Sequence, residues 1–372
     1  MNLRSPLTGN TLHRFGHVLE AGAERWPIVD DIAFLRADRR DLADHVLQHL
    51  ESGDENAALV MLLGDQDGWA RTPPPSEADR IELLARRDSI GFRQAMDLLA
   101  LGPVATYFAH RWSDPTLMSG LALAQAYWTQ PRRVLEVACG AGHFLPSFAS
   151  ADEVVGGDLV FAKLWLARHF VAPDAQLVCF DAAEPWPFAD QAADLVFCHD
   201  AFYFLPNKAD VAREMMRVGE QILVGHTHNR LTENLSAGQP LSPGGYADLF
   251  QGCTLFDDRE LTQSLVDLRK PVPASAEDLN TAAAIAIAWP GGSPISASGD
   301  VSQPKPGRKL SRNPLYEQGE IVWPSDRYER EYAALATYPV HSDAPASAWA
   351  GQSPDIDRLA LNRVLVELPP RW

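Results

Sequence analysis

The 372-residue sequence is poor in cysteine and contains no long apolar run. Its four cysteines, Cys139, Cys179, Cys198 and Cys253, lie far apart, and no two form a C-x-x-C pair. This excludes a disulfide framework and a zinc knuckle, and a reducing cytoplasm is the expected compartment. No run reaches the roughly 18 apolar residues that a membrane helix needs, and the first residues lack the apolar core of a signal peptide. We therefore expect a cytoplasmic protein without a membrane anchor or a bound metal.

Basic residues are also scarce, since 32 lysines and arginines stand against 49 acidic residues and leave a net charge of −17. Such a surface repels phosphate backbones, so a broad nucleic-acid-binding face is not expected. The hydrophobic share of 46% is ordinary for a globular protein, and the length predicts more than one domain.

The pattern of apolar residues divides the chain into four segments. Residues 1–36 favour a small β unit of two strands and a turn, and residues 37–130 have helical periodicity. Residues 131–230 alternate strand-like and helical stretches. Residues 231–372 have a weaker pattern and are expected to complete the sheet, with a Pro-, Gly- and Ser-rich mobile loop or linker at 290–315.

The alternating segment contains five strand-like runs. They are 134–139, 153–158, 176–180, 194–199 and 221–226. Apolar strands joined by helical crossovers predict an α/β fold with a parallel sheet covered on both faces. In such sheets ligands bind at the carboxyl ends of the strands, so the residues that follow each strand are the candidates for a binding site.

The first strand leads into a turn that lacks the third glycine of a dinucleotide-binding motif. Gly140 and Gly142 are present, but Leu145 occupies the third position. The strand also contains an acid, Glu136, which suits an ammonium group and not a phosphate. A helix expected from about His143 would direct its positive end at a carboxylate. Both ligand groups occur in the methionine part of S-adenosylmethionine.

The next two strands end in acids. Asp158 is placed to accept hydrogen bonds from ribose hydroxyls, a feature that dinucleotide-binding folds share. Asp181 is placed to accept from an adenine amine, and the Ala182 N–H is placed to donate to a ring nitrogen. A cofactor-free fold, in which these acids are only solvated loop residues, is the less favoured alternative.

The motifs E-V-A-C-G-A-G, G-G-D, F-D-A-A-E-P-W-P-F and A-D-L-V-F, taken in order, resemble class I S-adenosylmethionine-dependent methyltransferases over about residues 115–230. The resemblance implies a Rossmann-like, seven-stranded, mostly parallel sheet flanked by helices, and S-adenosylmethionine as the cofactor. The cofactor-binding residues that it implies are Glu136, Ala138, Gly140, Gly142, Asp158, Leu159, Asp181, Ala182 and His199. Ala138 stands where the family usually has glycine.

Candidates for catalysis follow the fourth and fifth strands. The stretch F-C-H-D-A-F-Y-F-L contributes His199, Asp200 and Tyr203, and V-G-H-T-H-N contributes His226 and His228. A histidine that titrates near neutrality is a suitable base where the methyl acceptor must lose a proton. The same side chains have ordinary alternatives as core, cofactor-wall or capping residues, and the two later histidines are the weaker candidates.

No Asn-Pro-Pro-Tyr tetrad, which amino-methylating enzymes of nucleic acids show, follows the fourth strand. Together with the acidity, this favours a small-molecule or protein acceptor. Two other functions stay open: a catalytically inactive, methyltransferase-like cofactor-binding or partner-binding protein, and a nicotinamide-dependent oxidoreductase, which the missing glycine and Glu136 disfavour. A monomer or a symmetric homodimer is expected.

The N-terminal stretch L-R-S-P-L-T-G-N-T-L … R-W-P-I-V-D-D-I-A-F-L-R resembles a small zinc-ribbon-like module that occurs alone or beside methyltransferases. Ser5-Pro6 replaces the Cys-Pro of that module, and no cysteine precedes Cys139, so we expect no zinc here. The alternative is a plain β-hairpin that covers one edge of the protein. Either way, scaffolding or partner contact is the expected role.

Overall fold

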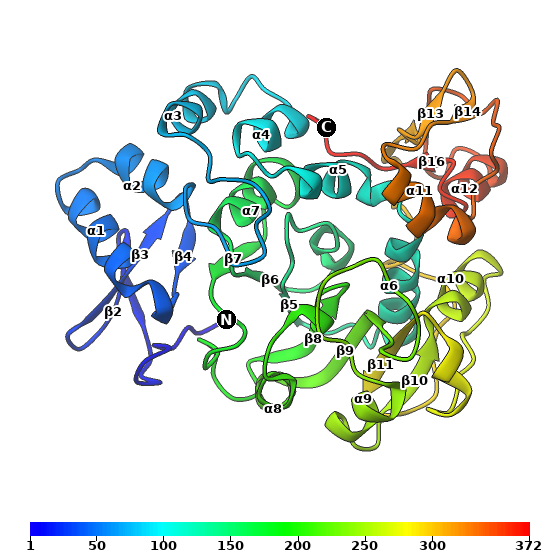
Figure 1. Cartoon of the computed structure of the whole chain (residues 1–372), viewed down its shortest axis with the longest axis horizontal. Helices are drawn as coiled ribbons and strands as arrows, with labels where there is room; N and C mark the ends of the chain where they lie inside the picture. The colour runs from blue at the N-terminus through cyan, green and yellow to red at the C-terminus, as the bar shows by residue number, and fades with distance from the viewer.

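The computed structural model describes residues 1–372 and is built around one sheet of eleven strands (Figure 1). From one edge to the other the strands are β1 (His13–Phe15), β2 (Val18–Ala21), β3 (Glu24–Val29), β4 (Ile32–Phe34), β7 (Gln176–Cys179), β6 (Glu153–Asp158), β5 (Arg133–Val137), β8 (Ala193–His199), β9 (Gly219–His228), β11 (Ala284–Trp289) and β10 (Thr254–Asp257). The strands from β4 through β7, β6, β5 and β8 to β9 run parallel. Their carboxyl ends therefore meet at one edge.

The α/β fold class is confirmed, but the prediction of seven strands is wrong. The seven strands from β7 to β10 form a sheet of the predicted size, and the N-terminal unit adds four more. This happens because β4 pairs in parallel with β7, with Ile32 opposite Leu177 and Phe34 opposite Cys179. The residues of β4 are buried, so the edge of β7 is covered and not left free to pair with another chain.

Residues 1–36 contain four strands where two were expected. The turn between β3 and β4 is the predicted one, and Asp30 and Asp31 have φ of 53° and 58°, as a tight hairpin turn requires. Ser5, where the zinc-ribbon-like module has cysteine, accepts hydrogen bonds from the N–H groups of Leu7 and Thr8 and donates one to Glu24. The resemblance to that module stays a prediction.

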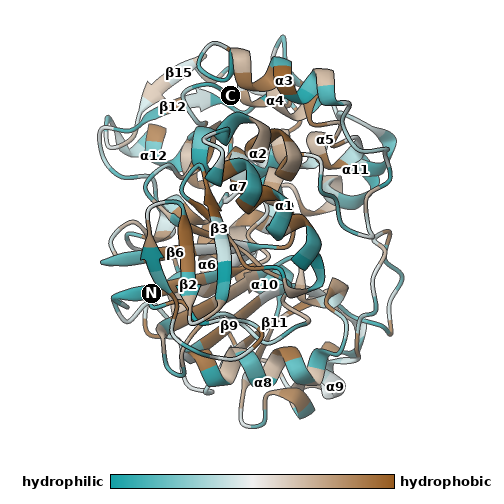
Figure 2. Ribbon diagram, turned by 90° about the vertical axis from the view of Figure 1, so that its left-hand side faces the viewer, coloured by the Kyte–Doolittle hydropathy of each residue, from teal (hydrophilic) through white to brown (hydrophobic).

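Helices pack on both faces of the half of the sheet that contains β8, β9 and β11. On one face α6 (Pro115–Ala126) packs against α10 (Asp258–Val266), and on the other lie α8 (Lys208–Val218) and α9 (Pro243–Leu249). Figure 2 shows the apolar strands between these two helix layers. Strand residues that alternate in direction fill both cores, since Phe197 faces α6 and α10 whereas Val196 and Cys198 belong to the other core.

Six further helices lie beside the N-terminal half of the sheet (Figure 1). They are α1 (Arg40–Glu51), α2 (Glu55–Leu62), α3 (Glu77–Arg86), α4 (Phe92–Leu98), α5 (Pro103–His110) and α7 (Phe161–Leu166). Helix α1 packs on β3, and α4 contacts both α5 and α7. None of the helices is both long and apolar enough to span a membrane.

The helix predicted from His143 is absent. The glycine turn is followed only by a four-residue 3-10 turn, Leu145–Phe148, and β6 begins at Glu153. The connection is too short for a crossover helix of several turns. The prediction that a helix dipole attracts a ligand carboxylate at this place is therefore wrong, because so short a turn has no appreciable dipole.

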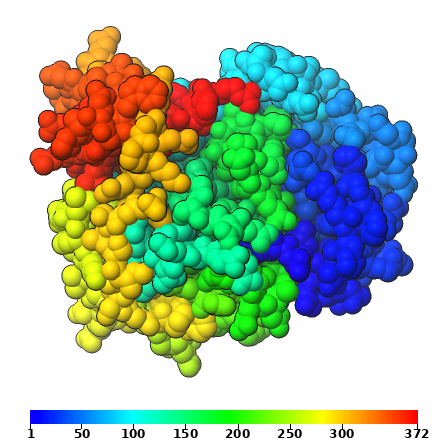
Figure 3. Space-filling model, turned by 180° about the vertical axis from the view of Figure 1, so that it is seen from behind, coloured from blue at the N-terminus to red at the C-terminus, as the bar shows by residue number.

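The last part of the chain forms a smaller unit with its own core. Its elements are β12 (Lys309–Arg312), β13 (Tyr316–Glu317), β14 (Glu320–Ile321), α11 (Asp326–Tyr332), β15 (Ser347–Trp349), α12 (Pro354–Leu361) and β16 (Leu365–Val366). The tail returns to the helical segment, where Phe92 N–H donates to the Arg371 carbonyl at 2.6 Å and Trp372 Nε1 donates to the Ala109 carbonyl at 2.7 Å. Figure 3 shows this red tail between the orange C-terminal unit and the cyan helices.

Candidate functional site

The glycine turn after β5 is held tightly against its surroundings. Gly140 and Gly142 have φ of 57° and 79°, and Ala138 also has a positive φ of 55°. The ring of Phe108, from α5, lies over Gly140, so that a methyl group added there would come within 3.0 Å of it. Glycine adopts such backbone angles freely, whereas alanine at position 138 adopts them at a cost.

Glu136 is buried in β5 without a partner. It is 3% exposed, its Oε2 is shielded, and the side chain makes no hydrogen bond. Burial raises the pKa of Glu136 well above its usual value, although the Arg111 charge opposes this. A buried carboxyl group without a hydrogen bond is costly. A ligand that brings an ammonium group would satisfy it, so this residue fits the methionine part of S-adenosylmethionine.

Asp158, at the end of β6, is tied to the glycine turn. Its Oδ2 accepts the Gly140 N–H at 2.9 Å, and its Oδ1 accepts the Val160 N–H at 2.9 Å. Each carboxylate oxygen can accept one more hydrogen bond, so the fixed side chain still suits two ribose hydroxyls. The carbonyl of the next residue, Leu159, accepts a hydrogen bond from Arg36 of the N-terminal unit at 3.1 Å.

The turn after β7 leaves a donor and an acceptor unused. Asp181 accepts the Ala183 N–H with Oδ1 at 2.8 Å, and its Oδ2 makes no hydrogen bond. The Ala182 carbonyl accepts from Trp186 Nε1 at 3.0 Å, whereas the Ala182 N–H has no partner. This pair matches the amine and ring nitrogen of an adenine, and the assignment of both residues stays a prediction.

His199 lies apart from these groups, among apolar rings. Its ring packs against Gly120 of α6 and Gly225 of β9, and a methyl group on Gly120 would approach it to 2.7 Å. Neither ring nitrogen has a hydrogen-bond partner. Burial lowers the pKa of His199 to about 3, and nearby Arg111 and His226 add to the effect. The ring is thus a neutral part of the core beneath α6.

Asp200, the next residue, receives two tyrosine hydroxyls. Oδ2 accepts from Tyr107 at 2.7 Å, and Oδ1 accepts from Tyr203 at 3.0 Å. The Arg111 guanidinium lies 3.8 Å from Oδ2. Burial would raise the pKa of Asp200, but the charges of His226 and Arg111 outweigh it and lower that pKa to about 2. Asp200 therefore stays ionised and binds or orients other groups, and it is not a proton acceptor at neutral pH.

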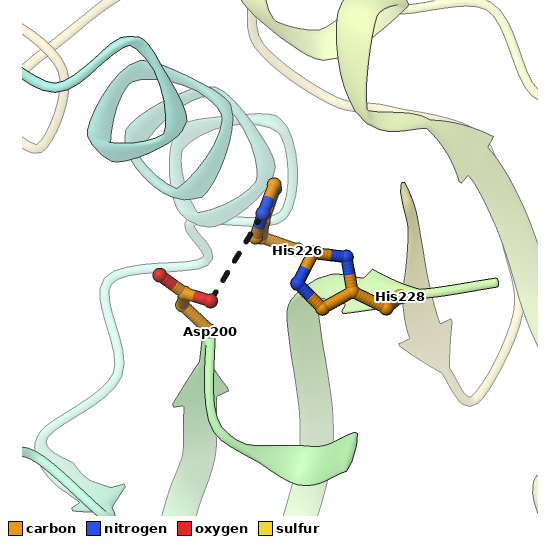
Figure 4. A group of neighbouring side chains, drawn as sticks. All are labelled: Asp200, His226 and His228. Carbon is orange, nitrogen blue, oxygen red and sulfur yellow. Dashed lines mark ion pairs between the residues drawn. The ribbon is translucent and has the colours of Figure 1, made fainter. Parts of the chain in front are cut away.

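His226 and His228, at the end of β9, complete this group. His226 Nδ1 lies 2.8 Å from Asp258 Oδ2, and its Nε2 lies 4.0 Å from Asp200 Oδ1. Although burial lowers it, the pKa of His226 rises to about 9 because Asp258 and Asp200 stabilise the charged ring. Burial and the His226 charge lower the pKa of His228 to about 4. Figure 4 shows Asp200 and His226 facing each other, with the His228 ring beside them.

Three residues of this group were not among the predicted ones. Tyr107 and Arg111 come from α5 and the turn after it, and Asp258 begins α10. Arg111 is 2% exposed and also pairs with Asp114 at 2.9 Å. Only the S-D-P start of α6, an N-cap signal, marks this region in the sequence. The contacts themselves join residues up to 93 positions apart, and no local pattern reports them.

Comparison with known proteins adds to this geometry. Residues 135–221, from β5 to the start of β9, match the family described as a methyltransferase domain. The resemblance to class I methyltransferases inferred from the sequence agrees with this match. The cofactor that this match implies is S-adenosylmethionine. The matched residues contain the glycine turn and both strand-end acids, in agreement with the resemblance seen in the sequence.

Two curated relatives match part of the chain. The chain is 26% identical over 162 residues to methyltransferase GfsG of Streptomyces halstedii, covering 39% of this chain and 58% of that protein. It is 34% identical over 100 residues to a malonyl-[acyl-carrier protein] O-methyltransferase of Legionella pneumophila, covering 24% of this chain and 32% of that protein. The chain thus spans less than two thirds of either relative.

Among solved structures, the chain is similar to the complex of the Haloferax volcanii Trm112 methyltransferase activator with its methyltransferase. The identity is 16%, the coverage is 56% of this chain and 100% of that chain, and the TM-score is 0.39. The overall likeness is therefore limited.

Proposed function

We propose that this protein transfers a methyl group from S-adenosylmethionine to a small-molecule or protein acceptor. When bound, the cofactor supplies a methyl group that is activated by a sulfonium, so the protein has to align the acceptor and exclude water. The observation that carries the proposal is the buried, unpartnered carboxyl group of Glu136 beside the glycine turn.

In the proposed site, each cofactor-binding residue has one task. Glu136 accepts from the ammonium group, Asp158 accepts from the ribose hydroxyls, and Asp181 with Ala182 pairs with the adenine. Ala138, Gly140 and Gly142 form the turn along which the methionine part lies, and Leu159 lines the ribose. His199 does not enter this proposal as a cofactor ligand or a base, since its ring is enclosed by α6 and β9.

The acceptor is proposed to bind over the ends of β8 and β9. Asp200 and Tyr203 lie there, next to β5 and its glycine turn, because β5 pairs with β8 and β8 with β9. The ionised Asp200 fixes the hydroxyl groups of Tyr107 and Tyr203, and these polar groups position the reacting atom of the acceptor in line with the methyl group.

Calorimetry tests the cofactor half of the proposal. The protein should bind S-adenosylmethionine but not NAD, and Asp158→Ala should weaken this binding at least about tenfold, since one lost pair of hydrogen bonds to ribose costs more than about 1.4 kcal/mol. Asp174→Ala is the matched control, because Asp174 is exposed at the opposite end of the sheet. Equal affinities of the Asp158→Ala variant and the wild type would refute the site.

A screen of acceptors with methyl-labelled cofactor then separates an active enzyme from an inactive cofactor-binding protein. Label in a product, lost in Tyr203→Phe but retained in Asp174→Ala, supports catalysis. Cofactor binding without transfer to any compound or protein fraction would favour the inactive alternative.

A further inference from the structure

Asp200, His226 and His228 bring three metal-binding atoms together. One carboxylate oxygen and one nitrogen of each histidine lie within 4.8 Å of one another, and Asp200 Oδ1 is 4.0 Å from His226 Nε2. The three side chains come from the carboxyl ends of two neighbouring strands and point toward a common space (Figure 4). Bonds of about 2.0–2.2 Å to a divalent ion place ligand atoms roughly 3–4 Å apart. The set therefore needs only small side-chain shifts to surround an ion.

The side chain of His228 is an independent indication of a ligand. It is 7% exposed and makes no hydrogen bond, although it lies among polar groups. Its ring contacts those of Tyr203 and His226, with centroids 4.3 and 5.2 Å away. No protein group occupies the ring nitrogens of His228, so a metal ion could use one of them.

The other two donors are fixed by a second layer of hydrogen bonds. Asp258 binds Nδ1 of His226, so that Nε2 is the nitrogen that faces Asp200. Carboxylates commonly orient metal-binding histidines in this way. Tyr107 and Tyr203 hold the Asp200 carboxylate, and Arg111 lies near its Oδ2, whereas Oδ1 faces His226. The carboxylate oxygen that Arg111 approaches is therefore not the one that faces His226.

We propose that Asp200, His226 and His228 form a two-histidine, one-carboxylate site for a divalent first-row transition metal ion. Imidazole and carboxylate donors in this number suit Zn²⁺, Fe²⁺, Co²⁺ or Mn²⁺ and leave coordination positions open. Cysteine spacing cannot reveal this site, since it contains no cysteine. The open positions would hold an oxygen of the methyl acceptor; this role rests on the proposed function, whereas ion binding does not.

Titration of chelator-treated, untagged protein with Co²⁺ and with Zn²⁺ tests the proposal. Calorimetry should show one ion per chain, and Co²⁺ should develop visible absorption bands from nitrogen and oxygen ligands. His228→Gln and Asp200→Asn should each weaken binding at least about tenfold, and Asp258→Asn about 10- to 100-fold through the orientation of His226.

His341→Ala is the matched control, because His341 also lies between two acids, Glu320 at 2.9 Å and Asp343 at 3.4 Å, but on the surface. No saturable binding, or binding that His341→Ala removes and His228→Gln retains, would overturn the proposal. Circular dichroism checks that each variant folds. If Asp200→Asn does not fold, the result for His228→Gln decides the test, since the His228 side chain makes no hydrogen bond whose loss would affect folding. Binding of S-adenosylmethionine, measured separately in the same variants, distinguishes failure of this site from failure of the cofactor site.

Discussion

Replacing Glu136 with glutamine should change the stability and the cofactor affinity in opposite directions. Burial raises the pKa of Glu136, so the folded state holds the proton more strongly than the unfolded chain. The stability that this protonated carboxyl group contributes is fully present below the unfolded pKa of about 4.3. It is lost as the pH rises toward the folded pKa, by up to about 1.4 kcal/mol per pH unit. The glutamine variant does not titrate. Without cofactor, the free energy of unfolding of the variant should therefore rise relative to that of the wild type between pH 5 and pH 8.

The cofactor affinity should fall in the same variant. A hydrogen bond between a carboxylate and an ammonium group contributes about 1.5–3 kcal/mol, so glutamine should weaken the binding of S-adenosylmethionine roughly 10- to 100-fold. Urea unfolding at several pH values and calorimetry with the cofactor measure the two effects.

Glu220→Gln is the control for both measurements, because Glu220 is an exposed residue of β9. It should change neither the stability nor the affinity. If Glu136→Gln leaves the cofactor affinity unchanged, then Glu136 is not the ammonium acceptor. If it destabilises the cofactor-free protein at pH 8, then the pKa of Glu136 is not raised by burial.

Three further predictions concern the rest of the fold. Ala138→Gly should raise the free energy of unfolding by about 0.5–1 kcal/mol in urea, since relief of the positive φ (about 1–2 kcal/mol) exceeds the entropy cost of glycine; a loss of stability would contradict the observed backbone. Phe34→Ala should lower it by about 3–5 kcal/mol, whereas exposed Phe15→Ala should not, and a small effect of Phe34→Ala would mean that the N-terminal unit is not part of the main core. Burial lowers the pKa of His143 to about 3, and the Arg111 charge lowers it further. The stability contributed by the neutral ring is therefore fully present above pH 6.5 and is lost as the pH falls toward 3. His143→Gln should therefore lose less stability than the wild type between pH 7 and pH 4, and parallel pH profiles would refute this.

The central strands were predictable because each is a local apolar run with a clear end. Asp158 and Asp181 follow such runs directly, so their places at the edge of the sheet could be inferred from the sequence. The pairing of β4 with β7 could not, since it joins residues about 145 positions apart and depends on which sheet edge is free. The prediction of a helix after the glycine turn was wrong because it relied on local pattern alone, and the few residues before Glu153 leave no room for a helix.

The two halves of the proposed site are built in different ways, and this limits what the relatives reveal. The cofactor half comes from short strand-turn segments inside residues 135–221, the span that matches the methyltransferase family. The acceptor half also needs Tyr107, which precedes that span, and His226 and Asp258, which follow it. Its geometry therefore depends on long-range contacts that the family match does not include. A relative that shares the matched span can share the cofactor while its acceptor differs, so the acceptor has to be identified by experiment on this chain.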